Sequence, residues 1–169
     1  MNLPNKLTVL RMLMVPLFMV LYLRGQIAVS AAVFAVASAT DWLDGYIARK
    51  NSIVTNFGKF MDPLADKLLI TGALLCLLSE GVVAVWAVMV ILAREFLVTG
   101  LRLVAVSEGK VIAAGGLGKI KTVLQMVAVL VGIFLGSAIL TDVFVYIATA
   151  LTAVSGIIYI WQNRSVFHD

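Results

Sequence analysis

The sequence has few charged residues and almost none of the side chains that enzymes use for covalent or zinc chemistry. Of its 169 residues, 13% are charged and 62% are hydrophobic, with one cysteine and one histidine. A single cysteine, Cys76, excludes an internal disulfide and a cysteine-cluster metal site. The histidine, His168, lies in a polar tail, which excludes a Ser-His or Cys-His pair within the apolar segments. Proton transfer in those segments must therefore use carboxylates.

The net charge of +4 does not indicate a nucleic-acid partner. The basic residues are spread among apolar segments, and no basic stretch is interleaved with aromatic residues as in nucleic-acid-binding proteins. We therefore expect no nucleic-acid partner and attribute most of the basic residues to membrane topology.

Long apolar stretches with short connections dominate the chain. A membrane-spanning helix needs about 20 mostly apolar residues, and six stretches meet this requirement approximately. We therefore predict an all-α integral membrane protein with six transmembrane helices, forming a single domain over residues 1–169. The expected helices are 5–24, 27–50, 57–80, 82–106, 117–138 and 141–162.

The distribution of basic residues predicts the orientation. The connections near Arg24, Glu80 and Thr141 hold one basic residue between them, while the remaining basic residues lie on or toward the other side. By the positive-inside rule, both termini are expected in the cytoplasm. No small-residue cleavage site follows the apolar run 12–23, so we expect a membrane helix there and not a removable signal peptide.

Four aspartates lie near the predicted inner ends of the second and third helices. Asp41 and Asp44 are on one helix face, as are Asp62 and Asp66. Ionisable groups at such depth usually line a polar cavity, so we expect an active-site cleft open to the cytoplasm. Four gathered carboxylates require protonation or bound cations. Oxygen ligands favour Mg²⁺ or Mn²⁺, and we predict two such ions, an arrangement that serves phosphoryl displacement.

Small residues accompany the aspartates on the same helix faces. Gly45 and Ala48 follow Asp44, and Gly58 precedes Asp62. Small residues in membrane helices permit close helix packing, but they also let a nucleotide or a diphosphate approach the backbone. The neighbouring carboxylates favour the ligand, and Arg49 could pair with a phosphate.

The segment Asp41-Trp-Leu-Asp44-Gly45-Tyr-Ile-Ala48-Arg49, followed at fixed spacing by Gly58, Asp62 and Asp66, resembles the signature of CDP-alcohol phosphatidyltransferases. The resemblance implies that Asp41, Asp44, Asp62 and Asp66 bind metal and that Asp66 is also the catalytic base. It further implies a set of residues around the CDP-lipid, namely Asp41, Gly45, Ala48, Arg49 and Gly58.

A second polar group lies on the fourth and fifth predicted helices and indicates an anionic acceptor. We predict that its cations bind the acceptor phosphate; they are Arg94, Arg102, Lys119 and Lys121. The structural alternative is that Arg94 pairs with Glu95 or another buried acid, while the lysines only orient their helix.

Further segments resemble the phosphatidylglycerophosphate synthase branch of this family. They are Pro4-Asn5-Lys6-Leu7-Thr8, Arg11, Arg94-Glu95-Phe96, Thr99-Gly100-Leu101-Arg102 and Gly118-Lys119-Ile120-Lys121-Thr122. The resemblance implies transfer of a phosphatidyl group from CDP-diacylglycerol to sn-glycerol 3-phosphate, at the cytoplasmic membrane of a bacterial cell. Alternative acceptors are serine, inositol phosphate and phosphatidylglycerol, and a small divalent-cation transporter is a further alternative.

Two other features have both a functional and a structural interpretation. Asn5, Thr8 and Arg11 share one side of a helix and could contact the lipid headgroup or anchor the chain at the membrane surface. Gly132 and Gly136 form a GxxxG pair that could mediate packing within the chain or a homodimer, and we predict the homodimer.

Overall fold

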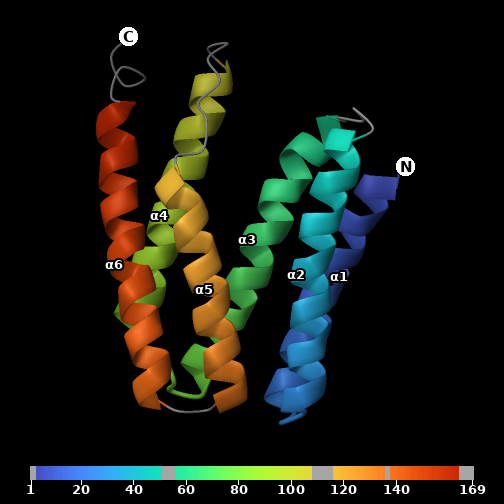
Figure 1. Cartoon of the computed structure of the whole chain (residues 1–169), viewed down its shortest axis with the longest axis vertical. Coiled ribbons are helices and arrows are strands. Elements are labelled where there is room, and N and C mark those ends of the chain that lie inside the picture. The colour runs from blue at the N-terminus through green and yellow to red at the C-terminus, as the bar shows by residue number, and fades with distance from the viewer. Residues whose placement is uncertain (1–2, 51–55, 108–115, 136–137, 164–169) are drawn as a thin grey trace. The chain divides into compact units, whose positions relative to one another are not determined.

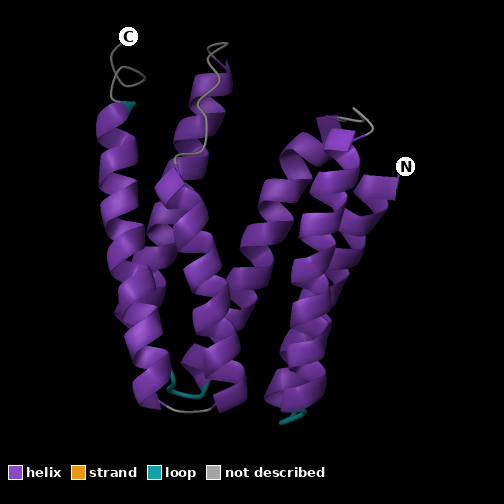
Figure 2. Cartoon of the chain, viewed as in Figure 1, coloured by secondary structure: helices purple, strands orange, loops and turns teal. Residues whose placement is uncertain are grey.

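The computed structural model is all-helical in the part of the chain that it describes (Figures 1 and 2). This part comprises residues 3–50, 56–107, 116–135 and 138–163. Within these ranges, the side chains of residues 3–4, 41–50, 56–60, 63, 103, 106–107, 116–119, 135 and 138 are not described. The helices are α1 (Leu3–Leu23), α2 (Ile27–Lys50), α3 (Asn56–Ser79), α4 (Val85–Ser107), α5 (Gly116–Leu135) and α6 (Ala138–Gln162). Over the described residues the prediction of six helices and no strand is confirmed.

The chain divides into two compact units of three helices each. Unit 1 is Met1–Ser79 and unit 2 is Glu80–Asp169. In unit 1, α1 packs against both α2 and α3, and the ring of Phe18 on α1 lies 5.6 Å from that of Phe34 on α2 (centroid to centroid). In unit 2, α6 packs against both α4 and α5. One helix in each unit therefore carries most of the contacts with the other two.

The turn between α1 and α2 shows why the first helix ends where it does. Gly25 has a φ of +74°, a conformation that glycine adopts without steric cost. Its N–H donates to the carbonyl of Tyr22 at 2.8 Å, and the N–H of Gln26 donates to the carbonyl of Leu21 at 3.0 Å. This pair of bonds is the Schellman arrangement, which satisfies the last carbonyls of a helix. The local sequence Arg24-Gly25 thus fixes the α1–α2 reversal.

Three of the predicted helix boundaries differ from the structure by three residues. The fifth helix ends at Leu135 and not at 138. The fourth helix begins at Val85 and not at 82, because Gly81 takes a φ of +70° and Ala84 accepts the first helical hydrogen bonds, from Ala87 and Val88. The sixth helix begins at Ala138, so Thr141 is a helical residue and not part of a turn. Thr141 is fully buried, which a polar turn residue would not be.

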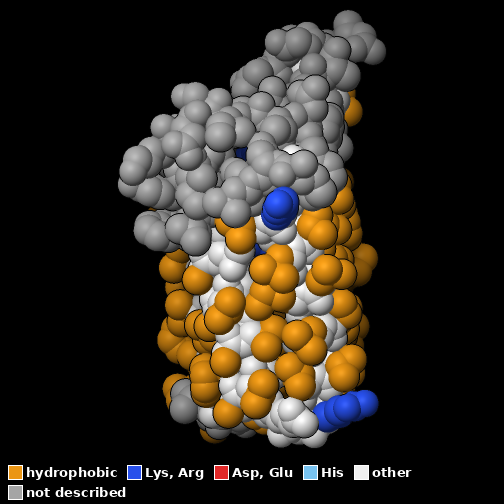
Figure 3. Space-filling view, turned by 90° about the vertical axis from the view of Figure 1, so that its right-hand side faces the viewer, with side chains coloured by type: hydrophobic (Ala, Val, Ile, Leu, Met, Phe, Trp, Pro, Cys, Tyr) orange, Lys and Arg blue, Asp and Glu red, His pale blue; other side chains and the backbone are white. Residues whose placement is uncertain are grey.

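The described surface is apolar to a degree that indicates a membrane environment. Large hydrophobic side chains are exposed on all six helices, including Leu13, Met89 and Ile157. On the face that Figure 3 shows, hydrophobic side chains cover most of the described surface, and lysine or arginine appears at only a few points. Among the described residues, two helical stretches are long and apolar enough to cross a membrane, Asn5–Leu23 and Ile139–Gln162. Soluble proteins rarely expose so much contiguous apolar area.

Unit 1 depends on a close approach of α1 to α3 at Gly72. A Cβ atom added at Gly72 would lie 3.0 Å from Cγ1 of Val15 and 3.3 Å from Sδ of Met19. These distances are shorter than most real Cβ contacts, so the missing side chain allows the two helices to pack closely. Small residues commonly have this role between helices in membranes.

We expect Gly72→Leu to lower the free energy of unfolding of the detergent-solubilised protein by about 1–3 kcal/mol, because the new side chain overpacks the α1–α3 contact. The matched control is Gly100→Leu, at a helical glycine with no atom within 4 Å of an added Cβ. Thermal or denaturant unfolding of both variants measures the difference. Equal losses at the two positions would contradict the close packing at Gly72.

Candidate active site

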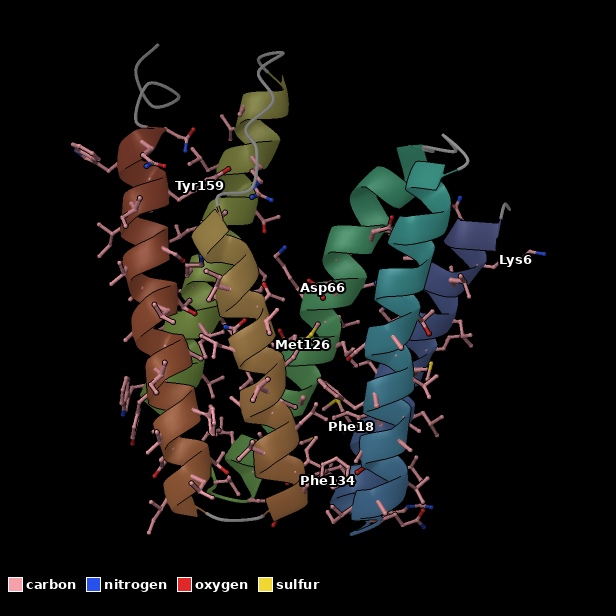
Figure 4. All side chains as sticks on the ribbon, viewed as in Figure 1. Lys6, Phe18, Asp66, Met126, Phe134 and Tyr159 are labelled. Atoms are coloured by element: carbon pink, nitrogen blue, oxygen red, sulfur yellow. The ribbon has the colours of Figure 1, made fainter. Side chains whose placement is uncertain are left out.

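Two of the four predicted metal ligands have described side chains, and both lie on α3. Asp62 and Asp66 are one turn apart on the same helix face, and both are partly exposed (Asp66 is labelled in Figure 4). Carboxylate oxygens are the ligands that Mg²⁺ and Mn²⁺ prefer. This described pair therefore fits the metal chemistry predicted from the sequence.

The polar residues at the start of α1 are buried inside unit 1. Asn5 is 8% exposed, while Thr8 and Arg11 are 0% exposed. The Thr8 hydroxyl donates a hydrogen bond to Oδ1 of Asp62 at 2.6 Å. A membrane-surface anchor would leave such side chains in contact with water or headgroups, so their burial disfavours that alternative. Their contact with a lipid headgroup stays a prediction.

The remaining predicted metal ligands and CDP-lipid residues belong to α2 or α3, and their side chains fall outside the described part of the structure. They are Asp41, Asp44, Gly45, Ala48, Arg49 and Gly58. The C-terminal end of α2 and the N-terminal end of α3 lie at the same end of unit 1 (Figure 1). Among the described side chains, no group of three or more potential metal ligands occurs. The four-aspartate set therefore stays a prediction.

Glu95 links two of the predicted acceptor-binding cations in unit 2. Its Oε1 forms an ion pair with Nη1 of Arg94 at 3.0 Å and a second ion pair with Nζ of Lys121 on α5. The side chain of Lys121 is only 2% exposed and that of Glu95 is 17% exposed. The structural alternative considered for Arg94, pairing with Glu95, is thus present. One carboxylate therefore contacts both cations.

Arg102 is held by Tyr159, a residue that the sequence did not single out. Nε of Arg102 donates a hydrogen bond to the Tyr159 hydroxyl at 3.0 Å, and its guanidinium carbon lies 5.4 Å from the ring centroid. Tyr159 itself is buried in a cluster with Val98, Leu101 and Ala105 of α4. The two terminal nitrogens of the guanidinium carry the remaining N–H donors of Arg102. Figure 4 shows Tyr159 on the C-terminal part of α6.

Gly156 lets α6 come close to the stem of Arg94. A Cβ added at Gly156 would lie 2.8 Å from Cγ of Arg94, a distance that real Cβ contacts essentially never show. Nε of Arg94 is buried and has no hydrogen-bond partner among the described residues. The glycine therefore provides the space in which the Arg94 stem lies.

The structure brings together the described members of the predicted cation group. Arg94, Arg102 and Lys121 lie within unit 2, whereas the side chain of Lys119 is outside the described part. Gly156 and Tyr159 are not among the residues predicted from the sequence; they lie on α6, which the sequence indicates only as an apolar span. The sequence pattern that could have identified them is the helical spacing of hydroxyl-bearing residues along α6. These residues form a buried polar face of Thr149, Thr152, Ser155 and Tyr159.

Comparison with known proteins identifies the family. The profile of the CDP-alcohol phosphatidyltransferase family matches residues 1–154. A Bacillus subtilis (strain 168) protein named CDP-diacylglycerol--glycerol-3-phosphate 3-phosphatidyltransferase is 44% identical, with 96% of this chain and 95% of that protein covered. A Rickettsia felis protein of the same name is 42% identical, covering 98% and 97%. A Mycobacterium tuberculosis (strain H37Rv) protein named probable phosphatidylglycerophosphate synthase is 40% identical, covering 94% and 80%.

The chain belongs to the CDP-alcohol phosphatidyltransferase family and is an enzyme. The family assignment made from the motif at residues 41–66 is therefore confirmed. Together with the apolar helices, it indicates an enzyme embedded in a membrane.

Proposed function

We propose that this enzyme transfers the phosphatidyl group of CDP-diacylglycerol to sn-glycerol 3-phosphate, giving phosphatidylglycerophosphate and CMP. The observation that carries this proposal is near full-length similarity, at 40–44% identity, to relatives named for that reaction. The cation group of unit 2 agrees with an acceptor that carries a phosphate. This chemistry belongs to anionic phospholipid biosynthesis.

We assign the metal site to Asp41, Asp44, Asp62 and Asp66. When bound, two divalent ions, Mg²⁺ or Mn²⁺, would neutralise charge on the diphosphate and on the departing phosphate. Asp62 and Asp66 support the assignment because they present carboxylates one turn apart on α3. Asp41 also serves the CDP-lipid in this proposal, together with Gly45, Ala48, Arg49 and Gly58.

The reaction proceeds by direct displacement at phosphorus. The acceptor hydroxyl oxygen forms a bond to the lipid-side phosphorus of the diphosphate, and the bond from that phosphorus to the CMP oxygen breaks. The proton of the attacking hydroxyl moves to Asp66. A carboxylate is a weak base at neutral pH, and its effectiveness depends on its position beside the hydroxyl. No oxidant, reductant or covalent enzyme intermediate is required.

The acceptor phosphate is bound by the cations of unit 2 in this proposal. Arg102 suits a phosphate because its planar guanidinium can donate two parallel hydrogen bonds. Tyr159 supports it by accepting the hydrogen bond from Nε. Arg94, Lys119 and Lys121 supply further positive charge, with Glu95 as the counter-ion of two of them. A neutral acceptor such as serine would leave this charge without a ligand.

The membrane arrangement completes the proposal. Six spanning helices, cytoplasmic termini and an active site open to the cytoplasm would place the water-soluble acceptor and the nucleotide on the side where they are made. The acyl chains of CDP-diacylglycerol would remain among membrane lipids. The predicted homodimer is retained as part of this proposal, although Gly136 lies outside the described residues.

The reaction is tested by following CMP release from CDP-diacylglycerol in detergent with Mg²⁺ or Mn²⁺. We expect release with sn-glycerol 3-phosphate but not with serine, inositol phosphate or phosphatidylglycerol, and none after chelation of the metal. Asp66→Asn should lower the rate by about two to four orders of magnitude, because the base is lost. The control is Asp142→Asn, which removes a carboxylate near the start of α6 and should keep the wild-type rate.

Release of CMP only with a different acceptor would show that the proposed acceptor is wrong and that the reaction class is right. No release with any acceptor, from protein shown to be folded, would overturn the reaction. In that case, metal flux through reconstituted vesicles would identify a cation transporter.

The role of Tyr159 is tested by Tyr159→Phe, which removes the hydroxyl that holds Arg102 and keeps the ring. We expect the KM for sn-glycerol 3-phosphate to rise roughly fivefold with little change in kcat, as for a lost binding interaction of about 1 kcal/mol. The matched control is Tyr146→Phe, at an exposed tyrosine of the same helix that stacks on Trp86. An unchanged KM in Tyr159→Phe would contradict the role of the Tyr159 hydroxyl in supporting Arg102 for acceptor binding.

A further inference from the structure

We propose that Thr8 is a positioning residue for the metal ligand Asp62, and that its hydroxyl sets the metal affinity of the site. The inference rests on the proposed metal role of Asp62. It assigns to Thr8 a function inside unit 1 that differs from contact with the lipid headgroup.

The contact between Thr8 and Asp62 is a short hydrogen bond from a buried donor. The hydroxyl of Thr8 is 2.6 Å from Oδ1 of Asp62, a distance in the range of strong O–H···O⁻ bonds. Thr8 is fully buried, whereas Asp62 is partly exposed. The donor is therefore fixed by packing, and it orients one oxygen of a carboxylate on a partly exposed residue.

The packing of α1 on α3 keeps the donor in place. The two helices start at the same end of unit 1 (Figure 1). Thr8 meets Asp62 near that end, and Val15 and Met19 meet Gly72 two to three turns further along. Two such contacts fix the register of a parallel helix pair. In this register Arg11, one turn after Thr8, lies at the level of Asp66, one turn after Asp62.

The charge of the site makes this orientation consequential. A carboxylate that binds a metal ion gains from a donor that holds it in one orientation. The hydroxyl is such a donor, and it adds no charge that would repel a cation. Outer-shell donors of this kind orient ligating carboxylates, and their loss typically weakens metal binding by about 10- to 100-fold. Thr8 donates to a carboxylate on a different helix, whereas Thr149 donates to the carbonyl of Val145 on its own helix at 2.7 Å.

The test compares Mn²⁺ binding by the purified metal-free protein, measured from the electron paramagnetic resonance signal of free Mn²⁺. Thr8→Val keeps the shape of the side chain and removes the hydroxyl, and Thr8→Ser keeps the hydroxyl. We expect Thr8→Val to weaken Mn²⁺ binding roughly tenfold or more, and Thr8→Ser to bind within about threefold of the wild type. Thr149→Val, which loses a buried hydroxyl bonded within α6, is the matched control and should bind as the wild type does.

Thermal unfolding without metal separates a structural role from a positioning role. If Thr8→Val lowers the unfolding temperature but binds Mn²⁺ with wild-type affinity, the inference is wrong. Should Thr8→Val fail to fold, Thr8→Ser against Thr8→Ala isolates the hydroxyl, with the same two outcomes. Binding that is absent in the wild type, or undiminished in Asp62→Asn, would contradict the metal role of Asp62 itself and the inference with it.

Discussion

Burial of charge among apolar helices is the constraint on which the rest of this structure depends. A carboxylate or an ammonium group taken out of water loses several kcal/mol of solvation unless a partner replaces the water. The described residues meet this requirement through hydrogen bonds and ion pairs. In unit 1 the hydroxyl of Thr8 is a partner of Asp62, and in unit 2 Glu95 pairs directly with Arg94 and Lys121.

These contacts suit what each unit has to bind in the proposed reaction. A carboxylate that must accept a divalent cation can be oriented by a hydroxyl, which adds no charge that would compete with the metal. A cation group that must accept a phosphate can tolerate one internal carboxylate, provided that positive charge remains in excess. Small residues make both arrangements possible, because Gly72 allows α1 to reach α3 and Gly156 leaves space for the stem of Arg94.

Sequence patterns predicted the helices and the family well, and the tertiary contacts poorly. Apolar runs located all six described helices, with differences of three residues at the start of α4, the end of α5 and the start of α6. A positive-φ glycine and a buried threonine account for those at α4 and α6. The aspartate spacing identified a carboxylate pair on α3, because helical periodicity is local. The contacts of Thr8 with Asp62 and of Arg102 with Tyr159 join residues more than 50 positions apart. Such contacts depend on helix register, which composition and periodicity do not encode.

The proposed metal site is tested by the number of divalent ions bound per chain, since four gathered aspartates require compensating positive charge. Equilibrium dialysis of the purified protein against Mn²⁺, followed by elemental analysis, measures this number. We expect two ions per chain in the wild type and fewer in Asp62→Asn and in Asp66→Asn. No bound ion in the wild type, or an unchanged number in both variants, would contradict the proposed metal site.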